Sequence, residues 1–165
     1  MTQVPDPAPV VLAHPGFSPD EINTAEPTRA ARLKWVVAVN AQLPPGLAVN
    51  AAVCAASATA VAIAGLLGLP ATDADGLTHP GLPWAGCTIL AATGEQLREL
   101  RMKAAQSDGV FVADMPAEAQ LTRVYDDYLA AVSAKASSEI DYYAVSVVGP
   151  RNRVDKLVKK LPLLA

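Results

Sequence analysis

Aromatic residues and an excess of positive charge are both lacking in this sequence of 165 residues. Phe, Trp and Tyr together make up 5% of the chain, so it lacks the aromatic platforms on which single-stranded nucleic acids stack. The 16 acidic residues outnumber the 13 basic ones, and the formal net charge at pH 7 is -3. A chain with this balance has no overall attraction to phosphate backbones. Nucleic-acid binding would therefore require a local basic patch.

Metal-ligating side chains are equally scarce. The chain has two histidines, His14 and His79, and two cysteines, Cys54 and Cys87. Their positions match none of the usual zinc-ligand spacings, and no glycine-rich phosphate-binding motif is present. We therefore predict that the protein has no metal site and uses no cofactor.

The N-terminal segment lacks the features of a targeting sequence. No basic residue precedes Arg29, and no sustained apolar run occurs there, which indicates neither a secretory signal nor a transit peptide. We expect a cytoplasmic protein in which Cys54 and Cys87 are reduced, buried thiols. Prolines at positions 5, 7, 9, 15, 19 and 27 interrupt both helix and sheet. Residues 1–31 are therefore predicted to form a proline-rich arm, either disordered or laid along the domain, and residues 32–165 a single domain.

Hydrophobic residues make up 52% of the chain, which is enough for one well-formed core. The segment from Leu33 to Asn40 is apolar on both faces after Trp35, as is typical of a central strand covered on two sides. Strand and helix patterns then alternate along the chain. We predict strands at 33–40, 86–92, 110–114 and 142–148, and helices at 46–67, 94–107, 117–133 and after Pro150. This alternation predicts an α/β three-layer sandwich, in which a four-stranded mixed sheet carries helices on both faces.

The alanine-rich helix predicted at 46–67 is long enough to be compared with a membrane span. It contains Asn50, Ser57 and Thr59, so we predict a buried helix of a soluble domain and no membrane association. The connection at 68–84 has roughly 17 residues, whereas about 4 to 6 is usual. A loop of this length is typical of a lid or a binding loop.

The segment at 117–133 is predicted to form one amphipathic helix. Its apolar residues share one helical face: Leu121, Val124, Tyr125, Tyr128, Leu129 and Val132. We interpret Tyr125 and Tyr128, together with Tyr142 and Tyr143, as core and sheet packing. Excess apolar surface on this helix would suit a homodimer.

Basic residues gather on the last predicted helix: Arg151, Arg153, Lys156, Lys159 and Lys160. Two interpretations are open. The residues form either an anion or RNA patch near the start of the helix or a solvated outer face opposite its apolar residues.

Four segments carry a resemblance to a known family. They are the run from Lys34 to Asn40, the helix from Gly46 through Cys54, the strand that ends in Asp114, and the closing run Val145-Ser146-Val147-Val148-Gly149-Pro150-Arg151-Asn152-Arg153-Val154-Asp155-Lys156-Leu157-Val158. These residues resemble the peptidyl-tRNA hydrolase type II fold. More closely, the chain is similar to an uncharacterised bacterial family that shares this fold and has no assigned activity. The resemblance extends from Lys34 to Leu164 and implies the same α/β sandwich.

The resemblance also implies which hydrolase residues are replaced. In the hydrolases a catalytic lysine follows the glycine before the first helix, and a histidine lies about two turns further along it. This chain has Leu47 and Cys54 at those positions. The aspartate at the end of the third strand is kept as Asp114, whereas Pro116 and Glu118 replace the small residue and the threonine that follow. These replacements disfavour peptidyl-tRNA hydrolysis and tRNA as a partner.

Asp114 is the first candidate site residue, because ligands of open α/β sheets collect beyond the carboxyl ends of strands. Its carboxylate is either a general base toward water or a cap for the residues after the strand. Cys54 is either a nucleophile or a small core residue. A catalytic arrangement of Cys54, His79 and Asp114 would require the 68–84 loop to fold over the sheet edge.

The first and third strands are predicted to run parallel, so we expect the site residues to meet at one end of the sheet. The candidate ligand-binding residues are Asn40, Gly46, Asn50, His79, Trp84 and Glu118. Because the lysine and histidine are replaced, the sequence favours a module that binds a small molecule or a protein without hydrolysis. The alternative is a divergent hydrolase that acts on peptidyl-tRNA or another ester or amide, with Asp114 as general base.

Overall fold

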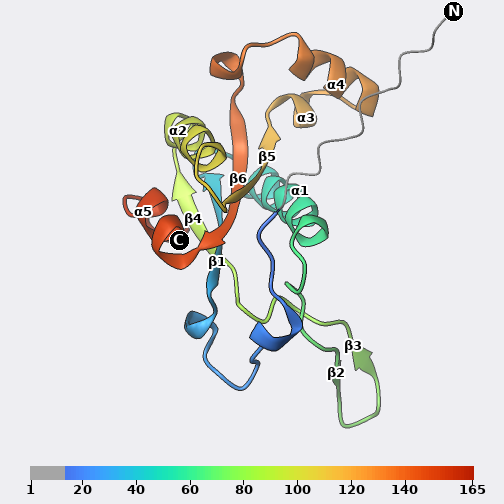
Figure 1. Ribbon diagram of the computed structural model, residues 1–165. Coiled ribbons are helices and arrows are strands. Elements are labelled where there is room, and N and C mark those ends of the chain that lie inside the picture. The colour runs from blue at the N-terminus through green and yellow to red at the C-terminus, as the bar shows by residue number, and fades with distance from the viewer. Residues whose placement is uncertain (1–13) are drawn as a thin grey trace, which may run out of the picture.

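Strand β1 (Leu33–Asn40) lies inside a four-stranded sheet of order β4-β1-β6-β5 (Figure 1). The computed structural model describes residues 14–165. β1 pairs in parallel with β4 (Thr88–Ala92) and antiparallel with β6 (Tyr142–Pro150), which pairs antiparallel with the edge strand β5 (Phe111–Pro116). β1, β4 and β5 therefore run in one direction, and their carboxyl ends lie at the same end of the sheet. The predicted four-stranded mixed sheet, with parallel first and third strands, is confirmed.

The two apolar faces of β1 supply both halves of the core. Val37 and Val39 pack on the side of helix α1, whereas Val36 and Ala38 pack on the opposite side. All four side chains are 0% exposed. A strand covered on both sides reads as a continuous apolar run rather than as an alternating one, which is why the sequence revealed β1 clearly.

Helix α1 (Pro45–Ala62) covers one face of the sheet. Its buried residues recur at helical spacing and are small, so the helix approaches the sheet closely; they are Ala48, Ala51, Ala55 and Thr59. Thr59 Oγ1 lies 2.7 Å from Ser146 Oγ, which also accepts a hydrogen bond from Trp35 Nε1 at 2.8 Å. The helix ends before the predicted limit at residue 67 and is buried on one face only. The helix was predicted to be buried, but the side chains on its outer face are exposed, so the prediction is wrong for that face.

Among residues 14–165, α1 is the one helix long and apolar enough to cross a membrane, with a mean hydropathy of 1.5 over 18 residues. A helix packed on the sheet of a globular domain meets the same two criteria. The small residues of α1 contact the sheet, so its length and hydropathy alone are weak evidence for a membrane span.

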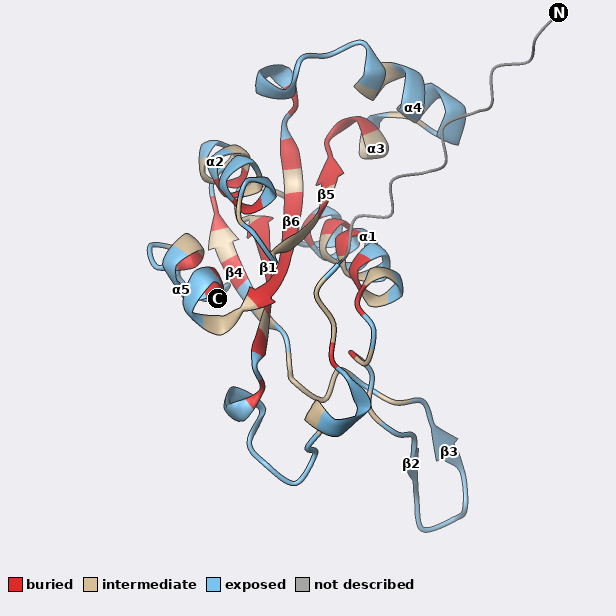
Figure 2. Ribbon diagram, in the orientation of Figure 1, coloured by how far each residue is buried: buried red, intermediate tan, exposed pale blue. Residues whose placement is uncertain are grey.

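Helices α2 (Gly94–Ala105) and α5 (Arg151–Val158) cover the other face. Thr93 caps α2, because its hydroxyl accepts from the Gln96 amide at 3.2 Å while the Gln96 side chain accepts from the Thr93 amide. Leu97, Leu100 and Ala104 of α2 and Val154 and Val158 of α5 turn toward the sheet. Figure 2 shows the buried residues concentrated in the sheet and on the inner sides of these helices. Helices therefore cover both faces, as predicted.

The predicted single helix at 117–133 is wrong. It is divided into α3 (Glu118–Leu121) and α4 (Tyr125–Ser133), because Thr122 and Val124 adopt extended backbone conformations. The Thr122 hydroxyl bonds back to the carbonyl of Glu118 and closes the first helix. Most of the predicted apolar face is exposed: Leu121, Val124, Tyr125 and Leu129. The interpretation of the tyrosines as core packing holds for Tyr142, which is buried, and fails for Tyr125, which is 73% exposed.

Residues 14–31 lie along the domain and contain two 3-10 helices, η1 (Pro19–Glu21) and η2 (Thr28–Ala30). Phe17 is 5% exposed, and its amide donates to the carbonyl of Ala64 at 2.9 Å. The remainder of the predicted arm, residues 1–13, lies outside the described residues.

The long connection at 68–84 carries a small hairpin of β2 (Ala71–Thr72) and β3 (Thr78–His79). In Figure 1 this hairpin projects at the end of the molecule opposite to α3 and α4. A third 3-10 helix, η3 (Ser137–Glu139), precedes β6. The connection between α1 and β4 thus lies toward the amino end of β1, away from the carboxyl ends of the parallel strands.

Candidate functional site

A cavity of about 760 Å³ lies at the carboxyl end of β5, between α1 and the α3–α4 segment. We call it the Asp114 groove. Its polar and aromatic lining comes from Asn50, Cys54, Ser57, Asp114, Thr122, Arg123, Tyr125 and Tyr128. The structure therefore brings together three of the predicted site residues, Asp114, Cys54 and Asn50.

Asp114 borders this groove from the edge strand and is held by an arginine. On β5 it shares the strand face of Val112, toward α2, because side chains alternate along a strand. Its Oδ2 accepts a hydrogen bond from Arg101 Nε on α2 at 3.1 Å, and its side chain is 19% exposed. The ion pair to α2, rather than a cap on the following turn, is thus the interaction that the structure records for this carboxylate.

Cys54 is exposed on α1, so the interpretation of Cys54 as a buried core thiol is wrong. Its sulfur lies 4.0 Å from Asn50 Oδ1, one helical turn earlier, and Asn50 Oδ1 also accepts from Gln120 Nε2 at 2.7 Å. Neither contact supplies a base for the thiol. Cys87 is exposed as well, so the expectation of two buried thiols fails at both positions.

His79 and Trp84 lie outside the Asp114 groove. His79 Nε2 sits 3.2 Å from Asp73 Oδ2 within the β2–β3 hairpin, at the far end of the molecule in Figure 1. Trp84 Nε1 donates to the carbonyl of Gly65 at 2.8 Å, and its ring contacts Phe17 with centroids 4.8 Å apart. The loop at 68–84 therefore does not cover the groove, and Cys54, His79 and Asp114 do not form a triad.

Asn40 and Gly46 also lie outside the groove lining, although Asn40 ends β1 and Gly46 follows it in the first turn of α1. Asn40 Oδ1 accepts from the amide of Gln42 at 3.0 Å and so stabilises the turn after the strand. Gly46 lies in the first turn of α1 with open space at the position of a Cβ. Asn40 is separated from β5 by β6 in the sheet, which explains why one shared site does not form.

Two arginines of α5 bind backbone carbonyls of segments that are distant in the sequence. Arg151 donates to the carbonyls of Thr28 and Ala31 and thereby holds the segment before β1. Arg153 donates to the carbonyl of Asp108. The other three basic residues of the predicted cluster are Lys156, Lys159 and Lys160. They lie on the sheet face opposite to the Asp114 groove.

Residues 33–165 match the model of a family described as protein of unknown function (DUF2000). The chain belongs to this family. A solved structure, that of the protein of unknown function Atu0240 from Agrobacterium tumefaciens strain C58, resembles this DUF2000 chain with a TM-score of 0.74 and 18% sequence identity. The match covers 81% of this chain and 98% of that one, and shows a shared fold. A search of curated proteins finds no significant match.

Glu118 of this DUF2000 chain is not among the residues that line the Asp114 groove. Its side chain is 6% exposed and pairs with Lys135 Nζ, while Oε2 has no hydrogen-bond partner among the described residues. Burial raises the pKa of the Glu118 carboxyl, but the hydrogen bond from Lys135 and a backbone hydrogen bond outweigh it and lower the pKa overall. The residue predicted to bind ligand thus anchors α3 to the segment after α4.

The tyrosines beside Asp114 remain protonated donors. Burial, followed by the charge of Asp114, raises the pKa of Tyr128 and that of Tyr142. The sequence pointed to neither Tyr128 as a lining residue nor Arg101 as the partner of Asp114. The one feature of the sequence that could have pointed to Arg101 is its spacing of three residues from Arg98, which places both arginines on one side of the capped helix.

Proposed function

We propose that this protein is a binding module that holds a small organic molecule in the Asp114 groove without cleaving it. The observation that carries the proposal is the shared lining of the groove by Asp114, Asn50 and Cys54, next to the exposed Tyr125. Ligand sites commonly combine an apolar or aromatic wall with a few convergent polar groups. The Asp114 groove has both parts.

The lining suggests the chemistry of the ligand. Tyr125 and Tyr128 stand edge to face with ring centroids 5.4 Å apart, and a planar molecule can pack against such a pair. Asn50 and the Tyr128 hydroxyl offer donors and acceptors. Arg101 already balances the charge of Asp114, so the groove does not require a cation. Arg123 also lines the groove and can donate to an oxygen of the ligand. An uncharged aromatic amide or alcohol fits these features.

Hydrolysis is the second candidate function, because Asp114 lies near the carboxyl end of β5, lines the groove and is partly exposed, in the expected peptidyl-tRNA hydrolase II-like fold. In that case Asp114 would serve as general base toward water that attacks an ester or amide. Three features weigh against it: the hydrolase lysine is replaced by Leu47, no base contacts the thiol of Cys54 among residues 14–165, and Asp114 is engaged with Arg101. Removal of one group that stabilises a developing oxyanion costs on the order of a hundredfold or more in rate.

Benzamide and benzyl alcohol are suitable first probes, titrated into 15N-labelled protein with amide chemical shifts as the readout. We expect saturable shifts at Asn50, Cys54, Asp114 and Tyr128. The substitution Tyr128→Ala should weaken binding, whereas Tyr143→Phe, on β6 outside the groove lining, should not. If no uncharged aromatic probe shifts these amides saturably, or if both variants bind equally, the proposed function is wrong.

A further inference from the structure

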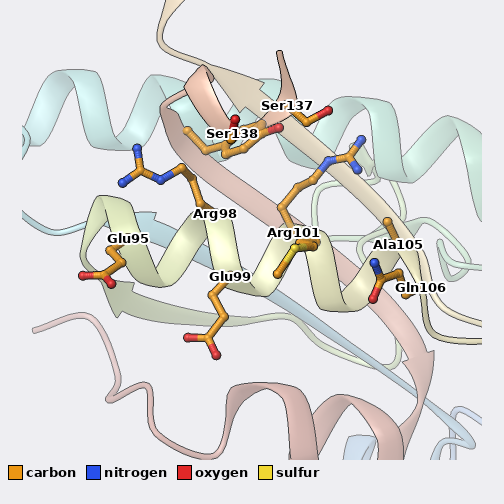
Figure 3. Close-up of a pocket in the computed structure, with 10 residues that line it drawn as sticks. Glu95, Arg98, Glu99, Arg101, Ala105, Gln106, Ser137 and Ser138 are labelled. Atoms are coloured by element: carbon orange, nitrogen blue, oxygen red, sulfur yellow. The ribbon is translucent and has the colours of Figure 1, made fainter.

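A second cavity, of about 780 Å³, lies along α2 on the other face of the sheet. We call it the arginine groove. It runs between α2 and the segment around η3, and its lining includes Arg98, Arg101, Met102, Ser137, Ser138 and Tyr142 (Figure 3). Its lining shares no residue with that of the Asp114 groove.

Two arginines project from one side of α2 into this space. Arg98 and Arg101 are three residues apart, a spacing that places them next to each other on a helix. Like charges at that spacing repel, and each arginine is balanced by an aspartate. Arg98 Nη1 donates to Asp141 Oδ1 at 2.8 Å, and Arg101 Nε donates to Asp114 Oδ2 at 3.1 Å.

These ion pairs use only part of each guanidinium. A guanidinium carries five N–H donors, and each arginine has one donor in a hydrogen bond to another described residue. Both side chains are also about two-fifths exposed, at 41% for Arg98 and 39% for Arg101. Each therefore retains several N–H groups that can reach a ligand in the groove.

The acidic residues along the groove point elsewhere. Figure 3 shows Arg98 and Arg101 on the side of α2 that faces Ser137 and Ser138, whereas the carboxylates of Glu95 and Glu99 point away from those serines. Glu99 is further occupied by an ion pair with Lys103. The space between the arginines and the serines is consequently rich in hydrogen-bond donors.

We propose that the arginine groove binds a small organic anion, in which a carboxylate or phosphate group is attached to an apolar or aromatic body. Arg98 and Arg101 would donate to the anionic oxygens in the short, charge-assisted geometry that guanidinium groups favour. The Ser137 and Ser138 hydroxyls can add further donors. Met102, which is 54% exposed, and the Tyr142 ring supply the apolar contact for the rest of the molecule. This ligand and this cavity both differ from those of the proposed function.

The test uses phenyl phosphate and benzoate, with benzyl alcohol as the uncharged counterpart, titrated into 15N-labelled full-length protein. We expect saturable shifts of the amides of Arg98, Arg101, Ser137 and Ser138 with at least one anion, and none there with benzyl alcohol. The stronger of the two anions identifies the preferred group. Saturable binding of the alcohol at the same amides, or no saturable binding of either anion, would overturn the proposal.

Variants that each remove one positive charge distinguish specific binding in the arginine groove from nonspecific electrostatic attraction of the anion. Arg98→Gln should weaken binding of the preferred anion about tenfold, the loss expected for one charge-assisted hydrogen bond. Lys156→Gln removes the same charge from α5, outside the lining of the arginine groove, and should leave the affinity unchanged. Arg101→Gln provides a second groove variant, and the dispersion of its amide spectrum reports whether it is folded. Equal weakening by the Arg98 and Lys156 substitutions would show nonspecific electrostatics and contradict the proposal.

Discussion

Arg101 on α2 and Asp114 on β5 form an ion pair, with Nε and Oδ2 3.1 Å apart, at the boundary between two cavities. Arg101 lines the arginine groove, and Asp114 lines the Asp114 groove. The pair thus ties a surface helix to the edge strand of the sheet. A ligand that displaces this contact at one groove would free the partner residue at the other, so binding at the two grooves would then be coupled reciprocally.

The first prediction concerns the stability of this pair. Asp114→Asn and Arg101→Gln should each lower the free energy of unfolding, and the double variant should lose less than the sum. The two side chains are 19% and 39% exposed, so we expect a coupling of about 0.5–1 kcal/mol. Urea denaturation of wild type, the two single variants and the double variant measures this coupling free energy.

The exposed Glu99–Lys103 pair on the same helix is the reference, with an expected coupling of about 0.3–0.5 kcal/mol. Strictly additive losses for Asp114 and Arg101 would contradict the prediction.

The second prediction concerns the pH dependence of stability at Glu118. The pKa of Glu118 is lowered in the folded state, so its contribution is complete above its ordinary value of 4.5 and is lost as the pH falls through the lowered pKa. The pKa of Lys135 is raised by Glu118, and its contribution is lost only at alkaline pH. Glu118→Gln should therefore cost about 1–3 kcal/mol at pH 7 and less in acid.

Urea denaturation of wild type and Glu118→Gln, repeated from pH 7 down to pH 3, provides the measurement. Glu95→Gln, on the outer side of α2, is the control and should follow the wild-type curve. A difference between wild type and Glu118→Gln that stays constant over this range would mean that the carboxylate does not contribute through its ion pair.

The third prediction concerns the polar contact inside the core. Ser146→Ala removes the acceptor of Trp35 Nε1 and the neighbour of Thr59 Oγ1, and an unpaired buried donor costs about 1–3 kcal/mol. Ser57→Ala, on the exposed side of α1, should change stability by less than about 0.5 kcal/mol. Urea denaturation distinguishes the two variants, and equal effects would show that the buried contact contributes little.

The fourth prediction is that the protein does not cleave peptidyl-tRNA at a useful rate. Leu47 cannot stabilise developing negative charge where the hydrolases have lysine, and the basic residues of α5 lie on the sheet face opposite to α1. A labelled peptidyl-tRNA, incubated beside a genuine type II hydrolase, should remain intact. Turnover within about tenfold of that enzyme, roughly 1.4 kcal/mol of barrier, and abolished by Asp114→Asn, would establish the hydrolase instead.

The layers of the fold were predictable because local patterns specify them. The doubly apolar run of β1 and the capping box at Thr93 and Gln96 each need only neighbouring residues to be recognised. The division of α3 from α4 was not predictable, since the apolar residues around Thr122 fit a continuous helix and only tertiary packing shows that they remain exposed.

The candidate site was predictable in part. Asp114 follows from the rule that ligands collect beyond strand ends, and Cys54 and Asn50 lie near it because α1 packs over β5. Arg101 could not be assigned, because it lies 13 residues before Asp114 on another element, and the distance between the two side chains depends on how α2 lies across the sheet. His79 and Trp84 were misplaced because the length of their loop gives no information on the end of the sheet from which it projects.

The most direct test of ligand binding in the Asp114 groove uses the two cysteines as reporters. Burial raises the pKa of the Cys87 thiol to about 12, so Cys87 reacts slowly throughout, and each thiol is compared with itself, with and without the probe. Cys87→Ser leaves Cys54 in the groove, and Cys54→Ser leaves Cys87 outside it. Each variant is labelled with a maleimide in the presence of the uncharged aromatic probe that binds best, at about ten times its dissociation constant. We predict that labelling of Cys54 slows by about tenfold, because only about a tenth of the groove remains empty, while labelling of Cys87 is unchanged. Equal rates with and without the probe at Cys54, or equal slowing at both thiols, would contradict the account.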